Sequence, residues 1–388
     1  MSADLPRPDS FALAHSAQLV EWLRERIVAA GGWISFADYM EQVLYAPGLG
    51  YYSAGARKFG AAGDFVTAPE ISPLFSRCLG RQCGEVLGRL EGGSILELGA
   101  GSGKMAAEML LELERLEQLP DEYLILEPGA DLRERQQNTL QELCPQLVSR
   151  VRWLDSGPAS FNGVIIANEV VDALPVNLMR TAAEGLQEMG VVVAGEGLAL
   201  ETRMASSQLL AATTEIAGFA DLPADYNSEI SLRLPAFITE LSGWLSSGVV
   251  ILLDYGFSRP EYYSPERSSG TLRCYYRHRA HEDPLLWPGL QDITAWVDFT
   301  LLAESALAAG LEVAGYTTQA QFLLAAGLES YLSATAENEP QAQAEQARAL
   351  RQLLMPGEMG EAVKVIALSK GDVAAPEGFS GRDMRSSL

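Results

Sequence analysis

The spacing of hydrophobic residues predicts helices at the start of the chain. Between residues 15 and 30, apolar side chains recur every three or four positions, which is the pattern of an amphipathic helix. A second helix is predicted over residues 36–45, because Ser35 and Asp38 have the spacing of an N-terminal capping box. The chain is therefore expected to begin with a helical region.

From residue 94 onwards, short apolar runs alternate with helical stretches. The expected strands cover residues 94–98, 123–126, 151–154, 163–167, 248–254, 311–317 and 362–368. The expected helices cover about 103–118, 131–143, 235–246 and much of the Ala- and Gln-rich stretch 319–354. Alternation of strand and helix implies a mostly parallel sheet with helices on both faces. The sequence thus predicts an α/β protein with a seven-stranded sheet.

Two segments interrupt this alternation. Residues 175–203 read as short strands with glycine turns, which favours an antiparallel excursion, and residues 256–298 form a second excursion rich in Tyr, Arg and Pro. The expected organisation is an N-terminal helical and Gly-rich region over 1–90, a core domain over 91–370 with insertions at about 175–235 and 256–298, and a tail over 371–388. The tail is polar and has few apolar anchors, so we expect it to be frayed.

Charge and composition exclude several classes of partner. The chain has 388 residues and a formal net charge of −23, and a surface of this sign repels the phosphates of nucleic acid. The four cysteines form no CxxC pair, which argues against a zinc site and a disulfide framework. No apolar run approaches the roughly 20 residues of a membrane helix. The N-terminus resembles neither a signal nor a transit peptide, so a cytoplasmic location is expected.

A glycine-rich turn directly follows the first predicted strand of the sheet. A P-loop is excluded, because Leu98 stands where its first Gly belongs and Met105 where its Ser or Thr belongs. A dinucleotide fingerprint fits poorly, because Lys104 replaces its third small residue. The remaining pattern, Glu97-x-Gly99-x-Gly101-x-Gly103, resembles motif I of class I S-adenosylmethionine (SAM)-dependent methyltransferases, and this resemblance implies that its four named residues contact the cofactor. Its glycines would let the backbone approach the cofactor, although a tight turn without a ligand is the alternative.

Polar residues at the ends of the next strands extend this candidate site. Glu127 closes the second strand and is placed to accept hydrogen bonds from the ribose hydroxyls of SAM. Asp155 would lie near the adenine, and Asn168 and Glu169 lie at the carboxyl edge of the fourth strand, where ligands gather in doubly wound sheets. Isolated acidic residues at strand ends are also common as solvated groups, so each of these roles has a structural alternative.

Several separated segments are similar to one family, the MidA-like SAM-dependent methyltransferases. The matching blocks are residues 63–72, 96–103, 167–175, 254–256, 291–299 and 359–360. The family includes a mitochondrial complex I assembly factor that methylates protein arginine. The resemblance implies a class I, Rossmann-like methyltransferase fold, SAM as the cofactor and a protein acceptor such as a respiratory-complex subunit. It leaves the acceptor of this chain and its oligomeric state open.

An arginine acceptor would require carboxylates, because the guanidinium group is a poor nucleophile. Bidentate hydrogen bonds from the guanidinium to a carboxylate would hold it and localise a lone pair on one nitrogen. The candidates are Glu169, Asp172, Asp64 and Glu70. Glu169 and Asp172 are three positions apart and could face one cleft if a helical turn follows the strand. Cap and loop roles are the alternatives for these residues. Two other functions also remain open: a small-molecule methyltransferase, and a SAM-binding assembly factor with little turnover.

Overall fold

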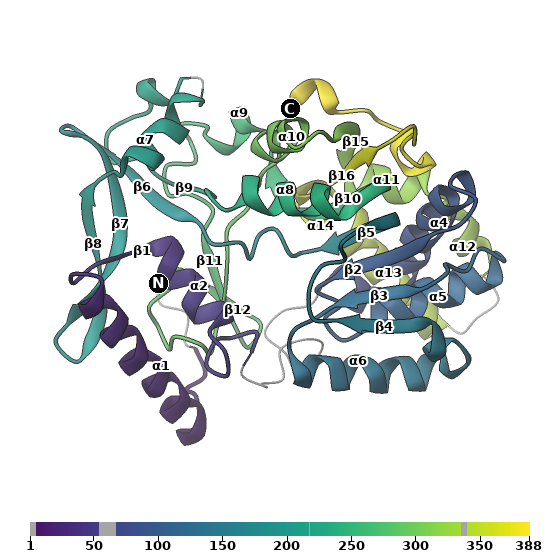
Figure 1. Ribbon diagram of the computed structural model, residues 1–388, viewed down its shortest axis with the longest axis horizontal. Coiled ribbons are helices and arrows are strands. Elements are labelled where there is room, and N and C mark those ends of the chain that lie inside the picture. The colour runs from purple at the N-terminus through teal and green to yellow at the C-terminus, as the bar shows by residue number, and fades with distance from the viewer. Residues whose placement is uncertain (1–4, 54–66, 217, 335–339) are drawn as a thin grey trace. The chain divides into compact units, whose positions relative to one another are not determined.

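The chain divides into two compact units. The computed structural model describes residues 5–53, 67–216, 218–334 and 340–388 (Figure 1). The first unit comprises Met1–Phe65, Asp172–Ala236 and Ser258–Asp298, and the second comprises Val66–Val171, Phe237–Phe257 and Phe299–Leu388. These boundaries differ from the expected ones, because the N-terminal helices share a hydrophobic core with both excursions.

A mostly parallel sheet forms the centre of the second unit. Its strand order is β15-β16-β10-β5-β2-β3-β4. The strands are β2 (Ser94–Leu98), β3 (Tyr123–Leu126), β4 (Val151–Leu154), β5 (Phe161–Asn168), β10 (Leu245–Phe257), β15 (Glu312–Thr318) and β16 (Val363–Lys370). Strands β4, β3, β2, β5 and β10 pair in parallel, whereas β16 is antiparallel to both β10 and β15. The seven predicted strands are confirmed.

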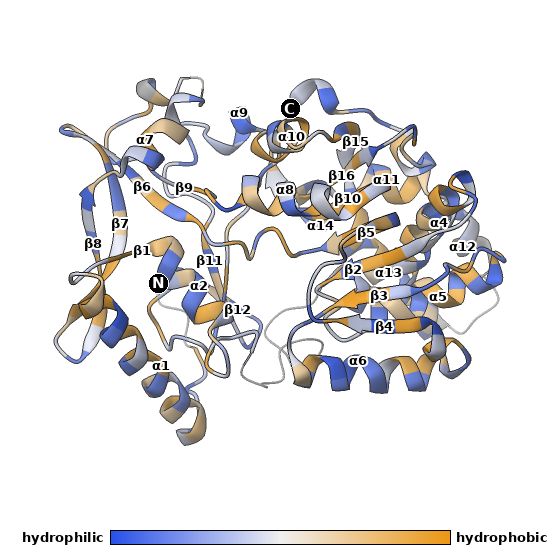
Figure 2. Ribbon diagram, viewed as in Figure 1, coloured by the Kyte–Doolittle hydropathy of each residue, from blue (hydrophilic) through white to orange (hydrophobic). Residues whose placement is uncertain are grey.

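Both faces of this sheet are buried. Ile95 and Ile125 point into one hydrophobic core together with residues of α4 (Pro73–Arg89) and α5 (Lys104–Arg115). Their neighbours Leu96 and Leu124 point to the opposite face and are also buried. Figure 2 shows the hydrophobic colouring of β3 and of most of β2. Burial on both faces explains why these strands read as continuous apolar runs in the sequence.

The other helices of the sheet unit include those predicted over 131–143, 235–246 and much of 319–354. They are α3 (Ala68–Ile71), α6 (Ala130–Leu143), α8 (Leu234–Trp244), which begins in the first unit, α10 (Phe299–Ala308), α11 (Gln319–Ala325), α12 (Leu328–Ala334), α13 (Pro340–Leu354) and α14 (Met359–Ala362), with a 3-10 turn η1 (Pro145–Arg150). No helix among the described residues is both long and apolar enough to cross a membrane.

The first unit combines helices with antiparallel sheets. Its helices are α1 (Ser10–Ala29), α2 (Phe36–Tyr45), α7 (Ser207–Thr214), α9 (Arg259–Tyr262) and the 3-10 turn η2 (Phe219–Asp221). One sheet has the order β1-β7-β6-β9 with β8 paired to β7, and a second has the order β12-β11-β13. The strands of these sheets are β1 (Ile34–Ser35), β6 (Asn177–Ala182), β7 (Gly185–Ala194), β8 (Gly197–Met204), β9 (Asn227–Ile230), β11 (Arg273–Tyr276), β12 (Arg279–His281) and β13 (Asp292–Thr294), and the short strand β14 (Val297–Asp298) belongs to neither of them. The antiparallel excursion expected over 175–203 is therefore present.

The local signals at α2 and at the C-terminus had different outcomes. The Ser35 hydroxyl accepts a hydrogen bond from the Asp38 amide, so the predicted cap of α2 is confirmed. The segment after Lys370 has more anchors than its sequence suggested: Arg89 donates to two of its carbonyls, and Phe379 packs edge-on against Phe322. These partners lie far away in the sequence and could not be anticipated.

Candidate functional site

The turn between β2 and α5 owes its shape to glycine. Gly99, Gly101 and Gly103 have φ values of 65°, 53° and 84°. This left-handed backbone conformation is costly for residues with a Cβ, so the alternating glycines are required by the path of the chain. A Cβ on Gly103 would also lie only 2.9 Å from the Cα of Gln136. The turn therefore presents bare backbone at the carboxyl end of β2.

Gln136 of α6 connects this turn to the ends of two further strands. Its side chain is fully buried, and its amide nitrogen donates to the Gly101 carbonyl at 3.2 Å and to Glu127 at 3.3 Å. Its amide oxygen accepts a hydrogen bond from the Trp153 indole at 2.8 Å. The sequence analysis missed this residue. The available signal was that Gln136 is the polar member of the buried stripe that contains Leu132 and Leu140.

Glu127 occupies the position expected for a ribose-binding carboxylate. It directly follows β3, is largely buried, and accepts hydrogen bonds from the Gly129 amide at 2.9 Å and from Gln136. The geometry fixes the orientation of Glu127, and its contact with ribose stays a prediction.

Asp155 lies at the end of β4 and is exposed. Arg133 of α6 donates to its carboxylate at 2.6 Å and to the Leu154 carbonyl at 2.8 Å. The side chain of Asp155 is 92% exposed, so the ion pair leaves most of the carboxylate in contact with solvent. Its expected position near an adenine ring stays a prediction.

Glu97 is positioned differently from what the motif suggested. The carboxyl group is fully buried beneath the turn, and Tyr123 donates a hydrogen bond to its Oε2 at 2.6 Å. Oε1 has no hydrogen-bond partner among the described residues. Burial raises the pKa of Glu97 to about 7, although the Tyr123 hydrogen bond lowers it. Because this side chain has no exposed surface, the structure favours a supporting role over the direct cofactor contact that we expected.

The segment after β5 contains a strained acidic residue. Glu169 has φ 53°, a left-handed conformation that is uncommon outside glycine. Its Oε1 accepts hydrogen bonds from the Ala68 amide at 3.2 Å and from Asn168 Nδ2 at 3.1 Å, and its own amide donates to the Leu253 carbonyl at 2.9 Å. Such strain persists only where the surroundings enforce it, and it is concentrated at functional sites.

Asp254 holds the backbone that follows Glu169. This buried carboxylate at the end of β10 accepts hydrogen bonds from the amides of Val170 at 3.1 Å and Val171 at 2.8 Å. A Cβ built on Gly99 would lie 3.0 Å from the Val170 side chain. The strained segment and the glycine turn are therefore in contact at the carboxyl edge of the sheet.

The condition under which Glu169 and Asp172 would share one cleft, a helical turn after β5, is not met. Glu169 is left-handed, and the residues that follow it form bends and turns. Glu169 belongs to the second unit and Asp172 to the first. A shared role for the two carboxylates therefore stays a prediction.

Asp172 lies in a buried, acidic part of the first unit. Its backbone carbonyl accepts a hydrogen bond from the Ala295 amide at 2.9 Å. Nearby, the Tyr52 hydroxyl donates to Asp292 at 2.9 Å. Burial raises the pKa of Tyr52, and the charges of Asp292 and Asp172 raise it further. The sequence analysis missed Tyr52 and Asp292 as neighbours of Asp172, because they come from three separate segments.

Glu70 contacts the glycine turn. The Ser102 hydroxyl donates to Oε1 of Glu70, and the Lys104 ammonium lies 3.5 Å from Oε2. Ser102 belongs to the turn and Lys104 begins α5, so Glu70 ties α3 to the turn and to the start of the helix that follows it. This geometry favours a positioning role for Glu70 over the catalytic role that we considered. The other candidate from this part of the chain, Asp64, lies outside the described residues.

No metal centre is evident in the parts of the chain that the structure describes. They contain no group of three or more His, Cys, Asp or Glu side chains that could hold a metal ion. All four cysteines are buried as free thiols.

Comparisons with known proteins identify the family. The model of a family described as "Putative S-adenosyl-L-methionine-dependent methyltransferase" matches residues 78–317. A Drosophila melanogaster protein, "Protein arginine methyltransferase NDUFAF7 homolog, mitochondrial", is 28% identical, with coverage of 95% of this chain and 89% of that protein. The Danio rerio "Protein arginine methyltransferase NDUFAF7, mitochondrial" is 27% identical, with coverage of 88% and 85%.

A solved structure is more similar still. A COG1565 superfamily protein from Burkholderia thailandensis, crystallised bound to S-adenosyl-homocysteine (SAH), is 43% identical, with coverage of 99% of this chain and 100% of that chain and a TM-score of 0.93. These findings confirm the resemblance and the fold class inferred from the sequence. This chain belongs to the family of SAM-dependent methyltransferases.

Proposed function

We propose that this protein transfers the methyl group of SAM to an arginine side chain of a protein. The observation that carries the proposal is the placement of Glu169 beside the glycine turn. Its backbone is in the left-handed conformation, and its carboxylate accepts a hydrogen bond from the Ala68 amide. The names of the Drosophila and Danio relatives support arginine as the acceptor, since the similarity extends over most of the chain.

The residues around the turn fit SAM. The left-handed glycines leave no side chain between the backbone and a ligand, and Glu127 at the end of β3 can accept from hydroxyl groups. Asn168 Oδ1 is buried and has no hydrogen-bond partner among the described residues. A buried acceptor of this kind is normally paired by a ligand or an ordered water. It is suited to accept a hydrogen bond from the ammonium group of the cofactor.

The acceptor chemistry assigns the main role to Glu169. SAM supplies a methyl group on a sulfonium, which is a good leaving group, so the protein must mainly position and desolvate the reactants. Guanidinium has a pKa above about 12 and delocalises its lone pairs. Glu169 would accept hydrogen bonds from two of its N–H groups and localise a lone pair on the attacking nitrogen. That nitrogen bonds to the methyl carbon, the carbon–sulfur electron pair stays with sulfur, and the carboxylate accepts the released proton.

The contacts of Glu169 support this role. The Ala68 amide and Asn168 Nδ2 both donate to Oε1, so the carboxylate is oriented before the acceptor arrives. Preorganised groups need little rearrangement during the reaction, which lowers the barrier.

Glu169→Gln tests the proposal. The variant should bind SAH like the wild type but transfer tritiated methyl groups to lysate proteins roughly 10²- to 10⁴-fold more slowly, the range expected for the loss of a general base. Hydrolysis of the labelled wild-type products should yield methylarginine. Glu91→Gln is the matched control, because Glu91 is also left-handed, with φ 57°, but is exposed before β2.

Other results would redirect the proposal. Undiminished transfer by Glu169→Gln would remove the role of that carboxylate. Label found only in small molecules would favour a small-molecule methyltransferase, and SAH binding without any transfer would favour an assembly factor.

A further inference from the structure

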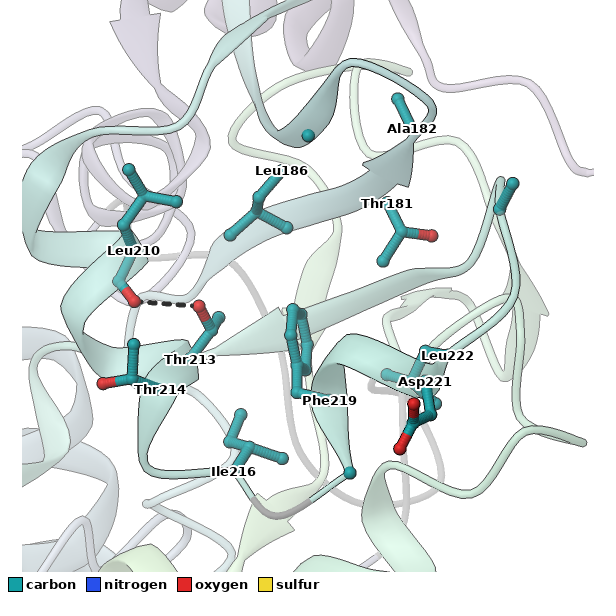
Figure 3. A pocket seen from close by; sticks show the side chains of 13 residues that line it. Thr181, Ala182, Leu186, Leu210, Thr213, Thr214, Ile216, Phe219, Asp221 and Leu222 are labelled. Atoms are coloured by element: carbon teal, nitrogen blue, oxygen red, sulfur yellow. Dashed lines mark hydrogen bonds between the residues drawn. The ribbon is translucent and has the colours of Figure 1, made fainter.

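The first unit contains a large, mainly apolar pocket. All of its lining residues fall within 181–224, so they are distant in sequence from the glycine turn at 99–103. Its volume is about 850 Å³, and it lies between the β6–β7 hairpin and the segment of α7 and η2 (Figure 3). The apolar side chains that line it are Leu186, Leu210, Ile216, Phe219 and Leu222. The volume lies within the roughly 300–1,000 Å³ typical of ligand pockets. Nothing in the proposed reaction accounts for this pocket.

The threonine hydroxyl groups in its wall are used within the chain. Thr181 donates its hydroxyl hydrogen to the Pro223 carbonyl at 2.5 Å, and Thr213 donates to the Leu210 carbonyl at 2.9 Å. Thr214 donates to the Ala211 carbonyl at 2.6 Å. An occupant would therefore meet mainly apolar surface, and burial of its own apolar groups would provide the affinity.

Exposed apolar side chains continue the pocket onto the surface. Leu210 lines the pocket and is 43% exposed, and Met204 is 61% exposed. Met204 lies beside the pocket, because a Cβ on the lining residue Gly185 would be 3.6 Å from its terminal methyl group. Large exposed apolar groups beside an apolar pocket mark interaction sites, and Met adapts to partners of different shape.

The surroundings of the pocket are strongly acidic. Exposed Glu184 adjoins the lining residue Gly185, and exposed Glu215 stands between the lining residues Thr214 and Ile216. The neighbouring arginines are already paired, Arg180 with Asp225 and Arg203 with Glu201. Asp221 lines the pocket itself and is exposed. The charge of this surface is complementary to a basic partner and would repel a second copy of the same surface.

We propose that this pocket docks a segment of the protein substrate in which apolar residues alternate with basic ones. The apolar side chains of that segment enter the pocket past Leu210, and its basic side chains lie near Asp221. This inference rests on the proposed function, because a protein that carries a methyl-accepting arginine supplies both chemistries. Such a docking site, separate from the glycine turn, would let the enzyme select protein substrates by the segments that flank their methyl-accepting arginine.

Labelled peptides test the docking directly. Ten-residue fluorescent peptides of alternating Leu and Arg, alternating Leu and Glu, and alternating Ser and Arg are titrated with the protein without SAM, and anisotropy is measured. The Leu/Arg peptide should bind at least tenfold more tightly than the other two. The double variant Met204→Ser, Leu210→Ser should weaken its binding at least tenfold, because it removes apolar surface without changing charge. Leu307→Ser is the matched control, since Leu307 is 61% exposed on α10 of the other unit.

Several results would overturn the proposal. Equal binding of the Leu/Arg and Ser/Arg peptides would mean that charge alone attracts them. Unchanged binding by the double variant, or equal weakening by Leu307→Ser, would place the peptide elsewhere. Light scattering that shows a dimer in the wild type and a monomer in the double variant would identify a second copy as the occupant.

Failure of docking and failure of the proposed function are distinguishable. If the wild type binds the Leu/Arg peptide but transfers no methyl group to any protein, the docking site stands and the proposed function fails. If the double variant methylates lysate proteins with unchanged KM and kcat, the docking site fails and the proposed function stands.

Discussion

Replacing Glu97 by Gln should alter how the stability of the second unit depends on pH. In the folded protein, burial raises the pKa of Glu97 from 4.5 to about 7. The unfolded chain exposes this side chain, so its pKa there is close to the ordinary value. The folded state therefore binds the proton more tightly, and the stability contributed by the protonated carboxyl is lost as the pH rises through 7.

The magnitude follows from the two pKa values. A shift of one unit corresponds to about 1.36 kcal/mol, so the full penalty of the ionised, buried carboxylate is about 3 kcal/mol above pH 8. Between pH 5.5 and pH 8.0 linkage predicts a change of about 2 kcal/mol. The free energy of unfolding of Glu97→Gln minus that of the wild type should increase by this amount over that range. Any constant cost of the altered Tyr123 hydrogen bond cancels in this comparison.

Native-state hydrogen exchange provides the assay, because it reports the opening of one unit in a protein that contains two. The free energies of exchange for amides of β2 and β5 would be compared at several pH values after correction for intrinsic exchange rates. Glu122→Gln is the control, since Arg152 lowers the pKa of Glu122 and its replacement should not reproduce the increase. A difference between Glu97→Gln and wild type that stays constant from pH 5.5 to pH 8.0 would refute the reasoning about burial.

Three further substitutions address the turn. Gly101→Val should abolish SAH binding measured by calorimetry while the fold remains, because the side chain occupies the backbone surface of a left-handed turn. Gln136→Leu should lower the free energy of unfolding by about 1–3 kcal/mol and weaken SAH binding, because it leaves its buried partners unpaired. Glu70→Gln should raise the Kd for SAH at most about fivefold, which corresponds to about 1 kcal/mol for its ion pair with Lys104.

Matched variants separate these effects from general damage. Gly310 also has a positive φ, 79°, with nothing within 4 Å of a built Cβ, so Gly310→Val should retain SAH binding. Glu108→Gln removes a comparably buried ion pair, with Arg77, and should leave SAH affinity unchanged. Tight SAH binding by Gly101→Val, or no loss of stability in Gln136→Leu, would contradict the geometry described above.

Local patterns determined much of the fold. The inner strands of the central sheet are short apolar runs because they are covered on both faces, and such burial leaves a direct mark on the sequence. The cap of α2 depends on Ser35 and its own first turn, and the glycine spacing reflects the left-handed backbone of Gly99 and Gly101. Each of these features depends on residues within a few positions of one another.

The candidate site was only partly determined in this way. The sequence placed Glu127, Asp155 and Asn168 at strand ends, where the structure also has them. It could not show that Glu97 is buried or that Glu70 binds the turn. The first depends on helices that cover the sheet, and the second on a partner 32 positions away.

Tertiary structure alone decided which distant segments share a core. The first unit is assembled from three separate stretches of chain, and the sheet unit from three others. Gln136 is informative because the helical stripe of Leu132 and Leu140 marks it only as buried, whereas its partners at the ends of three strands come from the fold. Hydrogen bonds and packing between remote residues depend on the whole path of the chain, whereas periodicity and turn chemistry depend on neighbours. The sequence of this protein therefore determined its elements and its glycine turn, and the folded chain decided which carboxylates support the site and which face it.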